Sequence, residues 1–380
     1  MITLQFNFKD MFLAPRLGFS GKKIWLQFVG LFLGYVFYLM FTYLALLADG
    51  GFTLGSIWDS FGLYPCAFSV GGIGLLPTIL AAIGVIGLLV GLLWSALTVA
   101  KVTYQQLRDD EFYPISEASD YAKKKVAHTL LSPVSIGLFV VLILVAGALV
   151  GLWGMIPFIG EWTVALLVIP AYFIGLFVVL SLIAIVLMLV YSPAIIAATD
   201  GDFFEGVLET YSMTIAQPWR LVVYQTLVKS SVLLAALVLY WFTAASLMLV
   251  KWAYGYIPSL SDGTKFQLIA DKAASFLPSC GWLCCGGSGG GMNPVAGMSW
   301  SWTLAAIIAG ISLFLIFGFV VAYALASLNV GHLLVYLNLK QRKDGENLLE
   351  REDFDAEPEL TETEPETEEK DEGEEENKEE

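Results

Sequence analysis

The stretch IGLLPTILAAIGVIGLLVGLLWSALTVA, residues 73–100, decides the fold class of this chain. It carries no charged residue, and about 20 consecutive apolar residues are enough for a helix to cross a bilayer. Five further stretches are also apolar over about 20 residues or more, one of them with a single lysine, Lys229, so the sequence predicts an all-α polytopic membrane helix bundle. The six transmembrane helices are expected at residues 24–48, 73–100, 133–153, 162–191, 221–250 and 302–325.

The acidic residues of the chain are concentrated at its C-terminal end. Overall, 14% of the residues are charged, against about 25% in soluble domains. Residues 351–380 hold 17 of the 35 acidic side chains and only 3 of the 20 basic ones. Such a segment has too little apolar surface to offset the entropy lost on ordering. We therefore expect a six-helix transmembrane domain at residues 1–343 and an acidic, disordered cytoplasmic tail at residues 344–380.

These two regions indicate different partners. The tail is expected to be either a solvated segment or a docking site for a basic partner or divalent cations. Its charge excludes nucleic acid as a partner, because the phosphates would repel it. The spans predict contact with membrane lipids and are compatible with a membrane-protein partner. The sequence leaves the oligomeric state open.

Lysine and arginine residues predict the orientation of the chain. They flank the spans on one side, whereas the opposite loops carry only Lys251, Lys265 and Lys272. Loops rich in these residues stay on the cytoplasmic side. We therefore expect a multi-pass protein of the bacterial inner (cytoplasmic) membrane with both termini in the cytoplasm.

Three amphipathic segments precede the first, third and fifth spans, at residues 8–28, 115–133 and 200–221. Each mixes acidic, aromatic and basic residues in a pattern typical of a helix that lies in the membrane interface. They predict three interfacial helices and suggest a threefold repeat, each unit being one interfacial helix and one helical hairpin.

Spans one to three each contain two glycines four residues apart, which let helix backbones approach closely in lipid. We expect these pairs to pack within the monomer, and the alternative for one of them is a contact between copies. The pairs are Gly30 with Gly34, Gly87 with Gly91, and Gly147 with Gly151.

All four cysteines fall in loops on the outer side. Cys66 precedes the second span, and Cys280, Cys284 and Cys285 lie in FLPSCGWLCCGGSGGGMNPV, residues 276–295. That side permits disulfides, so we expect Cys66 to pair with one of the other three, and the sequence leaves open which one. A four-thiolate metal site and a redox-active thiol centre are alternatives, although the spacing is typical of neither. The glycine run is interpreted as a flexible connector, because it lacks the Lys-Ser/Thr of a phosphate-binding loop.

The sequence shows no catalytic constellation, and we predict no catalytic residue, no cofactor and no resident metal. The densest polar cluster outside the tail is ATDGDFFEGVLETY, residues 198–211. Asp200 or Asp202 is expected to cap the helix that follows, where acidic residues suit the N-terminal dipole. The alternative is an interfacial site for a cation or a lipid headgroup, formed by Asp200, Asp202 and Glu205.

Other ionisable residues give weaker signals. His128 and His332 have no ligand-spaced partner and are expected to lie at the interface. Lys229 is the only ionisable residue expected inside a span, and its long side chain can reach the cytoplasmic surface. A proton-coupled transporter would normally carry ionisable groups within its spans.

Four stretches together resemble a family of uncharacterised six-span bacterial integral membrane proteins. The third is also distantly similar to the membrane domains attached to glycerophosphodiester phosphodiesterases. The resemblance implies the six-span architecture and no catalytic residues, because the family has no assigned activity. The stretches are APRLGFSGKKIWLQFVGLFLGY (14–35), QQLRDDEFYPISEASDYAKKK (105–125), SPAIIAATDGDFFEGVLETYSMTIAQPWRL (192–221) and LLVYLNLKQRKDGENLLE (333–350).

Three functions are compatible with these observations. The first is a non-enzymatic integral membrane protein that organises or binds membrane partners or lipids. The second is a transport protein, either a permease or a subunit of an export system, which should contain a polar cavity at mid-membrane. The third is an enzyme acting on lipid headgroups at the cytoplasmic interface, for which Asp200, Asp202 and Glu205 would have to bind a metal.

Overall fold

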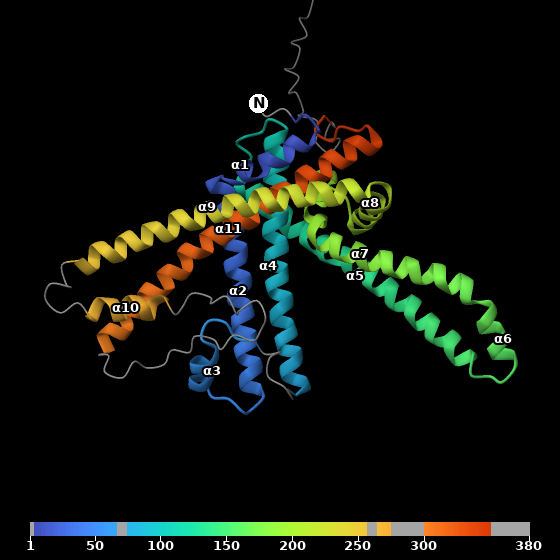
Figure 1. The fold of residues 1–380 in the computed structure, drawn as a ribbon, viewed down its shortest axis with the longest axis horizontal. Helices are drawn as coiled ribbons and strands as arrows, with labels where there is room; N and C mark the ends of the chain where they lie inside the picture. The colour runs from blue at the N-terminus through green and yellow to red at the C-terminus, as the bar shows by residue number, and fades with distance from the viewer. Residues whose placement is uncertain (1–3, 67–73, 257–263, 275–299, 351–380) are drawn as a thin grey trace, which may run out of the picture. The chain divides into compact units, whose positions relative to one another are not determined.

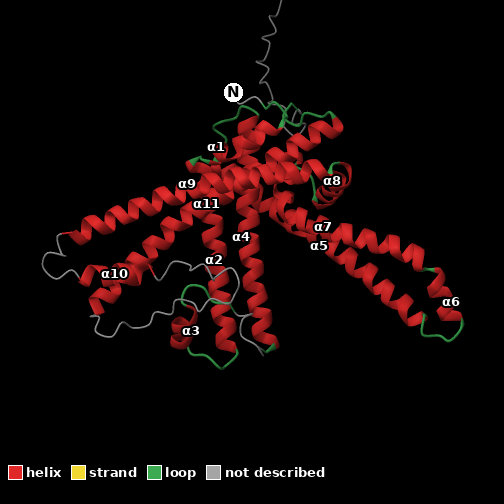
Figure 2. Ribbon diagram, viewed as in Figure 1, coloured by secondary structure: helices red, strands yellow, loops and turns green. Residues whose placement is uncertain are grey.

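The computed structural model describes residues 4–66, 74–256, 264–274 and 300–350, and every element within these ranges is a helix (Figure 2). Six of these helices are long and apolar enough to cross a membrane. The chain is therefore an integral, multi-pass membrane protein of the all-α class, as predicted. The six helices are α2 (Gly21–Ala48), α4 (Leu75–Leu107), α5 (Ile115–Trp153), α7 (Val168–Thr199), α9 (Pro218–Tyr256) and α11 (Trp300–Asp344).

Shorter helices precede or connect the long ones. The 3-10 helix η1 (Phe8–Leu13) and helix α1 (Ala14–Gly18) lead into α2, and α8 (Phe203–Ala216) leads into α9. They lie within the first and third predicted lead-in segments, but the first is divided into η1 and α1 and does not form one helix. Their position in the membrane interface stays a prediction. The remaining short helices are α3 (Leu54–Phe61), α6 (Ile159–Leu166) and α10 (Thr264–Ala274).

The second predicted lead-in is not a separate helix, and this expectation was wrong. Helix α5 runs without a break from Ile115 through Pro133 into the span, because no glycine or proline interrupts residues 115–132. Pro133 has no N–H to donate to the carbonyl of Thr129 one turn earlier. The hydroxyl of Ser192 on α7 donates to that carbonyl instead, at 3.3 Å, so the helix continues with its backbone group satisfied.

The long helices pair in sequence order. Helix α2 packs against α4, α5 against α7, and α9 against α11, and the pairs are visible in Figure 1. These three hairpins agree with the predicted hairpin arrangement.

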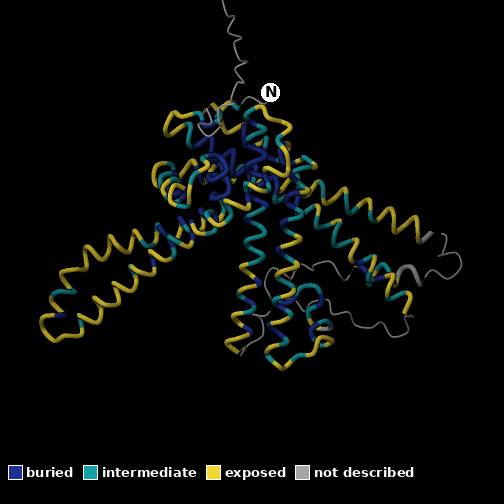
Figure 3. The backbone as a smooth tube through the Cα atoms, turned by 180° about the vertical axis from the view of Figure 1, so that it is seen from behind, coloured by how far each residue is buried: buried dark blue, intermediate teal, exposed yellow. Residues whose placement is uncertain are grey.

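Most of the buried core lies at one end of the long helices, in a cluster that we call the hub. Figure 3 shows the buried residues gathered there, while the rest of each hairpin is mostly exposed or half-buried. In the most apolar stretch of each span, only 6% to 22% of the residues are buried inside the molecule. The hub is formed by buried side chains within residues 99–107 of α4, 191–198 of α7, 221–232 of α9 and 330–339 of α11, with Met11 and Leu17.

Glycines set the close contact between α2 and α4. A Cβ added to Gly91 would lie 2.8 Å from the carbonyl oxygen of Gly30 and 2.9 Å from the Cα of Gly34. The first two glycine pairs therefore pack within the monomer, as expected. A Cβ added to Gly147 or Gly151 would meet nothing within 4 Å, so the third pair makes no such contact.

The first compact unit of the chain covers residues 1–349. The first unit extends past the predicted boundary at residue 343, because Leu348 is buried in the hub and its carbonyl accepts a hydrogen bond from the Tyr104 hydroxyl at 2.7 Å. The predicted disorder of the acidic tail concerns residues that lie almost entirely outside the described ranges.

Candidate functional site

An ion pair with a buried lysine and a half-exposed aspartate joins the first hairpin to the second at the hub. The Lys101 side chain, at the hub end of α4, is 7% exposed. Its Nζ lies 2.8 and 3.0 Å from the two carboxylate oxygens of Asp200, which follows α7. The same ammonium lies 4.4 Å from the ring centroid of Tyr121 on α5. The Lys101 ammonium therefore connects α4 to Asp200 at the end of α7 and to Tyr121 on α5.

The end of α7 explains how Asp200 reaches this position. Asp200 adopts a left-handed conformation with φ of 55°, which terminates the helix and turns the chain toward α8. Aspartate tolerates this conformation better than most residues with a side chain. Lys125 donates to the carbonyl of Asp200 at 2.8 Å, and the Tyr121 hydroxyl donates to that of Ile196 at 2.8 Å. These donors satisfy carbonyl groups at the C-terminal end of α7, and the positive charge of Lys125 suits the negative end of the helix dipole.

The other two acids of the predicted interfacial site lie on the α8 side of this turn. Asp202 occupies the N-cap position of α8, as expected, but its side chain makes no capping hydrogen bond. Its Oδ1 instead lies 3.7 Å from Nζ of Lys125 and 3.9 Å from Nδ1 of His128. Glu205 lies in the first turn of α8, with its carboxylate against Gly201.

This arrangement places basic side chains beside Asp200 and Asp202. Within the described residues, no three His, Cys, Asp or Glu side chains are grouped closely enough to hold a metal ion. A cation at Asp200, Asp202 and Glu205 would have to compete with Lys101 and Lys125. The cation or headgroup site therefore stays a prediction.

The loop between α4 and α5 lies close to this cluster. Burial raises the pKa of the Tyr113 hydroxyl, and the negative charges of Glu117, Asp200 and Asp110 raise it further. The phenol therefore stays neutral at physiological pH. Lys22 at the start of α2 donates to the Tyr113 carbonyl, which attaches this loop to the first hairpin.

A second ionic cluster joins α8 to the end of α11. Lys340 pairs with Glu209 and also lies 2.9 Å from Asp344, while Lys343 donates to the hydroxyl of Ser212. Lys101 and Lys340 belong to the basic residues that predicted the orientation of the chain, and the sequence did not indicate their pairing. Lys340 and Glu209 are 131 residues apart, so no local pattern could have revealed the contact.

Polar contacts also connect the first hairpin to α11. The Gln27 amide donates to the Ser95 hydroxyl at 2.9 Å, and Asn329 donates to Gln27 at 2.8 Å. Lys23 is buried, and its ammonium donates to the Gln106 side chain at 2.7 Å and to the Leu17 carbonyl at 3.1 Å.

The remaining predicted residues are dispersed. Lys229 is exposed on α9, whereas His332 is buried in α11, where its Nε2 lies 3.1 Å from the Gln225 amide. Cys66 is half-buried after α3. The other three cysteines and the glycine run lie outside the described residues, so the disulfide stays a prediction.

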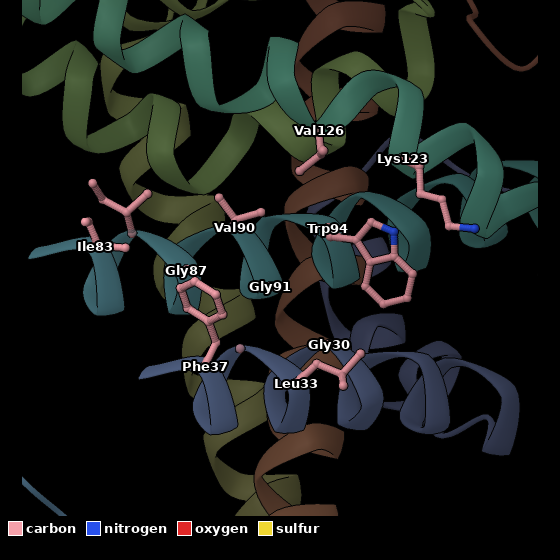
Figure 4. Close-up of a pocket in the computed structure, with 12 residues that line it drawn as sticks. Gly30, Leu33, Phe37, Ile83, Gly87, Val90, Gly91, Trp94, Lys123 and Val126 are labelled. Carbon is pink, nitrogen blue, oxygen red and sulfur yellow. The ribbon is translucent and has the colours of Figure 1, made fainter. Parts of the chain in front are cut away.

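A groove of about 560 Å³ lies between α2, α4 and α5. Figure 4 shows Leu33 and Phe37 on the α2 side, Ile83, Val90 and Trp94 on α4, and Val126 on α5. Among the described residues that line it, Lys123 is the only ionisable one, and it lies at the Trp94 end. The groove can therefore accept an apolar chain with one negative group.

Comparisons of the chain with protein-family models, with curated proteins and with solved structures find no match. The resemblance to the six-span bacterial family therefore stays a prediction. Any functional conclusion must come from the geometry described above.

Proposed function

We propose that this chain is a non-enzymatic protein that organises or binds membrane partners or lipids through helical hairpins fastened at one hub. The observation that carries the proposal is the contrast between the hub and the spans. The hub is closed by buried side chains, whereas no more than 22% of the residues in the most apolar stretch of any span are buried. The spans therefore leave most of their surface to lipid or to other membrane helices.

The difference in burial between the hub and the spans follows from how helices associate in a membrane. In lipid there is little hydrophobic driving force between apolar helices, so association depends on close packing and interhelical polar contacts. This chain concentrates such polar contacts at the hub, in the Lys101–Asp200 and Lys340–Glu209 pairs. The exposed parts of the hairpins remain available for partners that offer close packing.

The alternatives have less support from the described residues. A transporter would need a polar path, whereas the groove between α2, α4 and α5 is apolar except for Lys123 at its end. The Asn329 amide already donates to Gln27, and the Gln27 amide donates to Ser95. A headgroup enzyme would need the carboxylate of Asp200, which Lys101 occupies.

On the distribution of lysine and arginine, we place the protein in the inner membrane with both termini in the cytoplasm. The hub then lies at the cytoplasmic side. It would hold the three hairpins where soluble partners can also reach them.

The test is site-specific photo-crosslinking of the full-length protein in intact cells. The photoreactive residue replaces Leu142 on α5 or Trp241 on α9, whose side chains are 60% and 74% exposed. We expect discrete adducts of reproducible mass from these positions. The matched control is Phe112, which is 92% exposed but lies outside the long helices, and it should not give the same adducts.

Two outcomes would contradict the proposal. If both span positions gave no protein or lipid adduct, the hairpins would not be docking elements and the proposal would fail. Substrate turnover by the purified protein that is lost in D200N or D202N would support an enzyme instead.

A further inference from the structure

We propose that the groove between α2, α4 and α5 binds one acyl chain of an anionic phospholipid, whose phosphate is held at Lys123. The inference rests on the lipid-binding form of the proposed function and adds the site, the lipid class and the recognising residue. Its three supports are the length of the groove, its volume and the charge at one end.

The groove has the length of one leaflet. Along α4 it extends from Ile83 to Trp94, which at the rise of an α-helix is about 16 Å. The hydrocarbon core of a bilayer is about 30 Å thick, so one leaflet contributes about 15 Å. The predicted span covers residues 73–100, and most of the groove, residues 87–94 of α4, lies in the half nearer the hub. An acyl chain of the leaflet on the hub side can therefore lie along it.

The volume suits a hydrocarbon chain better than a helix as the occupant. A helix about 10 Å wide and 16 Å long would displace about 1,200 Å³, more than twice the 560 Å³ of the groove. The floor is shallow because the Phe37 ring packs directly over the backbone of Gly87. A single flexible hydrocarbon chain fits this space, whereas a whole helix is larger than the groove.

The charge at the hub end selects the headgroup. Lys123 lies at the Trp94 end of the groove (Figure 4), where a phosphate would sit at the membrane interface. Its ammonium pairs with Asp120 at 2.8 Å, but the two side chains are 65% and 64% exposed. Exposed pairs of this kind contribute little, so a lipid phosphate can displace Asp120. Lys124, which is exposed next to Lys123, does not line the groove.

The test is native mass spectrometry of the purified full-length protein, equilibrated in detergent with phosphatidylglycerol or with phosphatidylcholine of identical acyl chains. The wild-type protein should retain one phosphatidylglycerol in preference to phosphatidylcholine. Lys123→Gln should lower phosphatidylglycerol retention about fivefold, since one lysine near the surface contributes about that factor, and should leave phosphatidylcholine unchanged. Val90→Phe should lower retention of both lipids, because it fills the groove.

Each variant has a matched control. Lys124→Gln removes the neighbouring exposed charge, and Val85→Phe adds the same ring on α4 at a 39% exposed position outside the groove. Both should bind lipid like the wild-type protein. Asp120→Asn frees Lys123 and should raise phosphatidylglycerol retention, whereas Glu117→Gln on the same helix should not. These exposed positions do not depend on correct core packing.

Equal retention of the two lipids by the wild-type protein would overturn the inference, as would equal losses in Lys123→Gln and Lys124→Gln. The two proposals can fail separately. Loss of lipid preference with retained adducts at Leu142 and Trp241 would leave the scaffold function standing. Preferential lipid retention without adducts at these positions would leave the lipid site standing.

Discussion

At the scale of single residues, the Lys101–Asp200 pair is the contact whose loss should lower the stability of the protein most. Lys101 is 7% exposed, whereas Asp200 is 47% exposed. Asp200→Asn would leave a buried ammonium without its carboxylate. Removing one partner of a fully buried pair costs about 3–5 kcal/mol, and the partial exposure of Asp200 reduces our expectation to about 2–3 kcal/mol. Thermal unfolding of the purified protein in detergent measures the difference.

Two further variants separate the ion pair from a general charge effect. Asp202→Asn removes a 70% exposed carboxylate 3.7 Å from Lys125 and should change stability by less than about 1 kcal/mol. The double variant Lys101→Met with Asp200→Asn removes both charges and should recover most of the loss, because no buried charge remains unpaired. If the double variant were less stable than Asp200→Asn alone, Lys101 would not depend on Asp200.

At the scale of elements, glycine positions with the same sequence motif differ in their surroundings. Gly91 lies against the backbone of Gly30 and Gly34, whereas Gly147 has open space around it. Gly91→Ala should therefore force α2 and α4 apart and cost about 1–3 kcal/mol, the usual effect of overpacking. Gly147→Ala is the matched control and should leave the unfolding temperature of the detergent-solubilised monomer unchanged. Equal losses from both substitutions would contradict the packing described here.

The helices themselves were largely predictable from sequence, and their contacts were not. Residues 73–100 predicted a span because an uncharged stretch of that length satisfies its backbone in lipid only as a helix, and α4 covers Leu75–Leu107. The composition signal ends where the helix leaves the apolar region, so it missed the extension that carries Lys101. It also could not show that the second lead-in is continuous with the span in α5, because an amphipathic pattern does not reveal where a helix breaks.

The candidate site was predictable only in part. The acids around Asp200 were recognised as a cluster, because they are adjacent in sequence. Their partner Lys101 lies 99 residues away, and only the fold brings the two together. The groove was not predicted, since it depends on the packing of three helices. The glycines of α2 and α4 predicted close contact between these helices. They did not predict the groove that lies beside this contact.

At the scale of the whole molecule, the hub should hold together a chain cut between hairpins. Buried side chains of α4, α7, α9 and α11 meet there, together with those of η1 and α1. The loop after α4 contains Phe112, which is 92% exposed, so a break between Asp110 and Glu111 should disturb little. We expect co-expressed fragments 1–110 and 111–380 to be recovered together when only the first is tagged.

The dependence on the hub can be tested within the same split protein. Leu333 on α11 is fully buried in the hub, and Leu333→Ala should cost about 2–5 kcal/mol and reduce recovery of the second fragment. Ile311 lies on the same helix but is 47% exposed, so Ile311→Ala should leave recovery unchanged. If the intact fragments failed to associate, or if Ile311→Ala separated them as readily as Leu333→Ala, contacts within the spans would matter more than the hub. If only Leu333→Ala reduced recovery of the second fragment, the hairpins would be held together at the hub. The rest of their surface would then be available to lipids and partners.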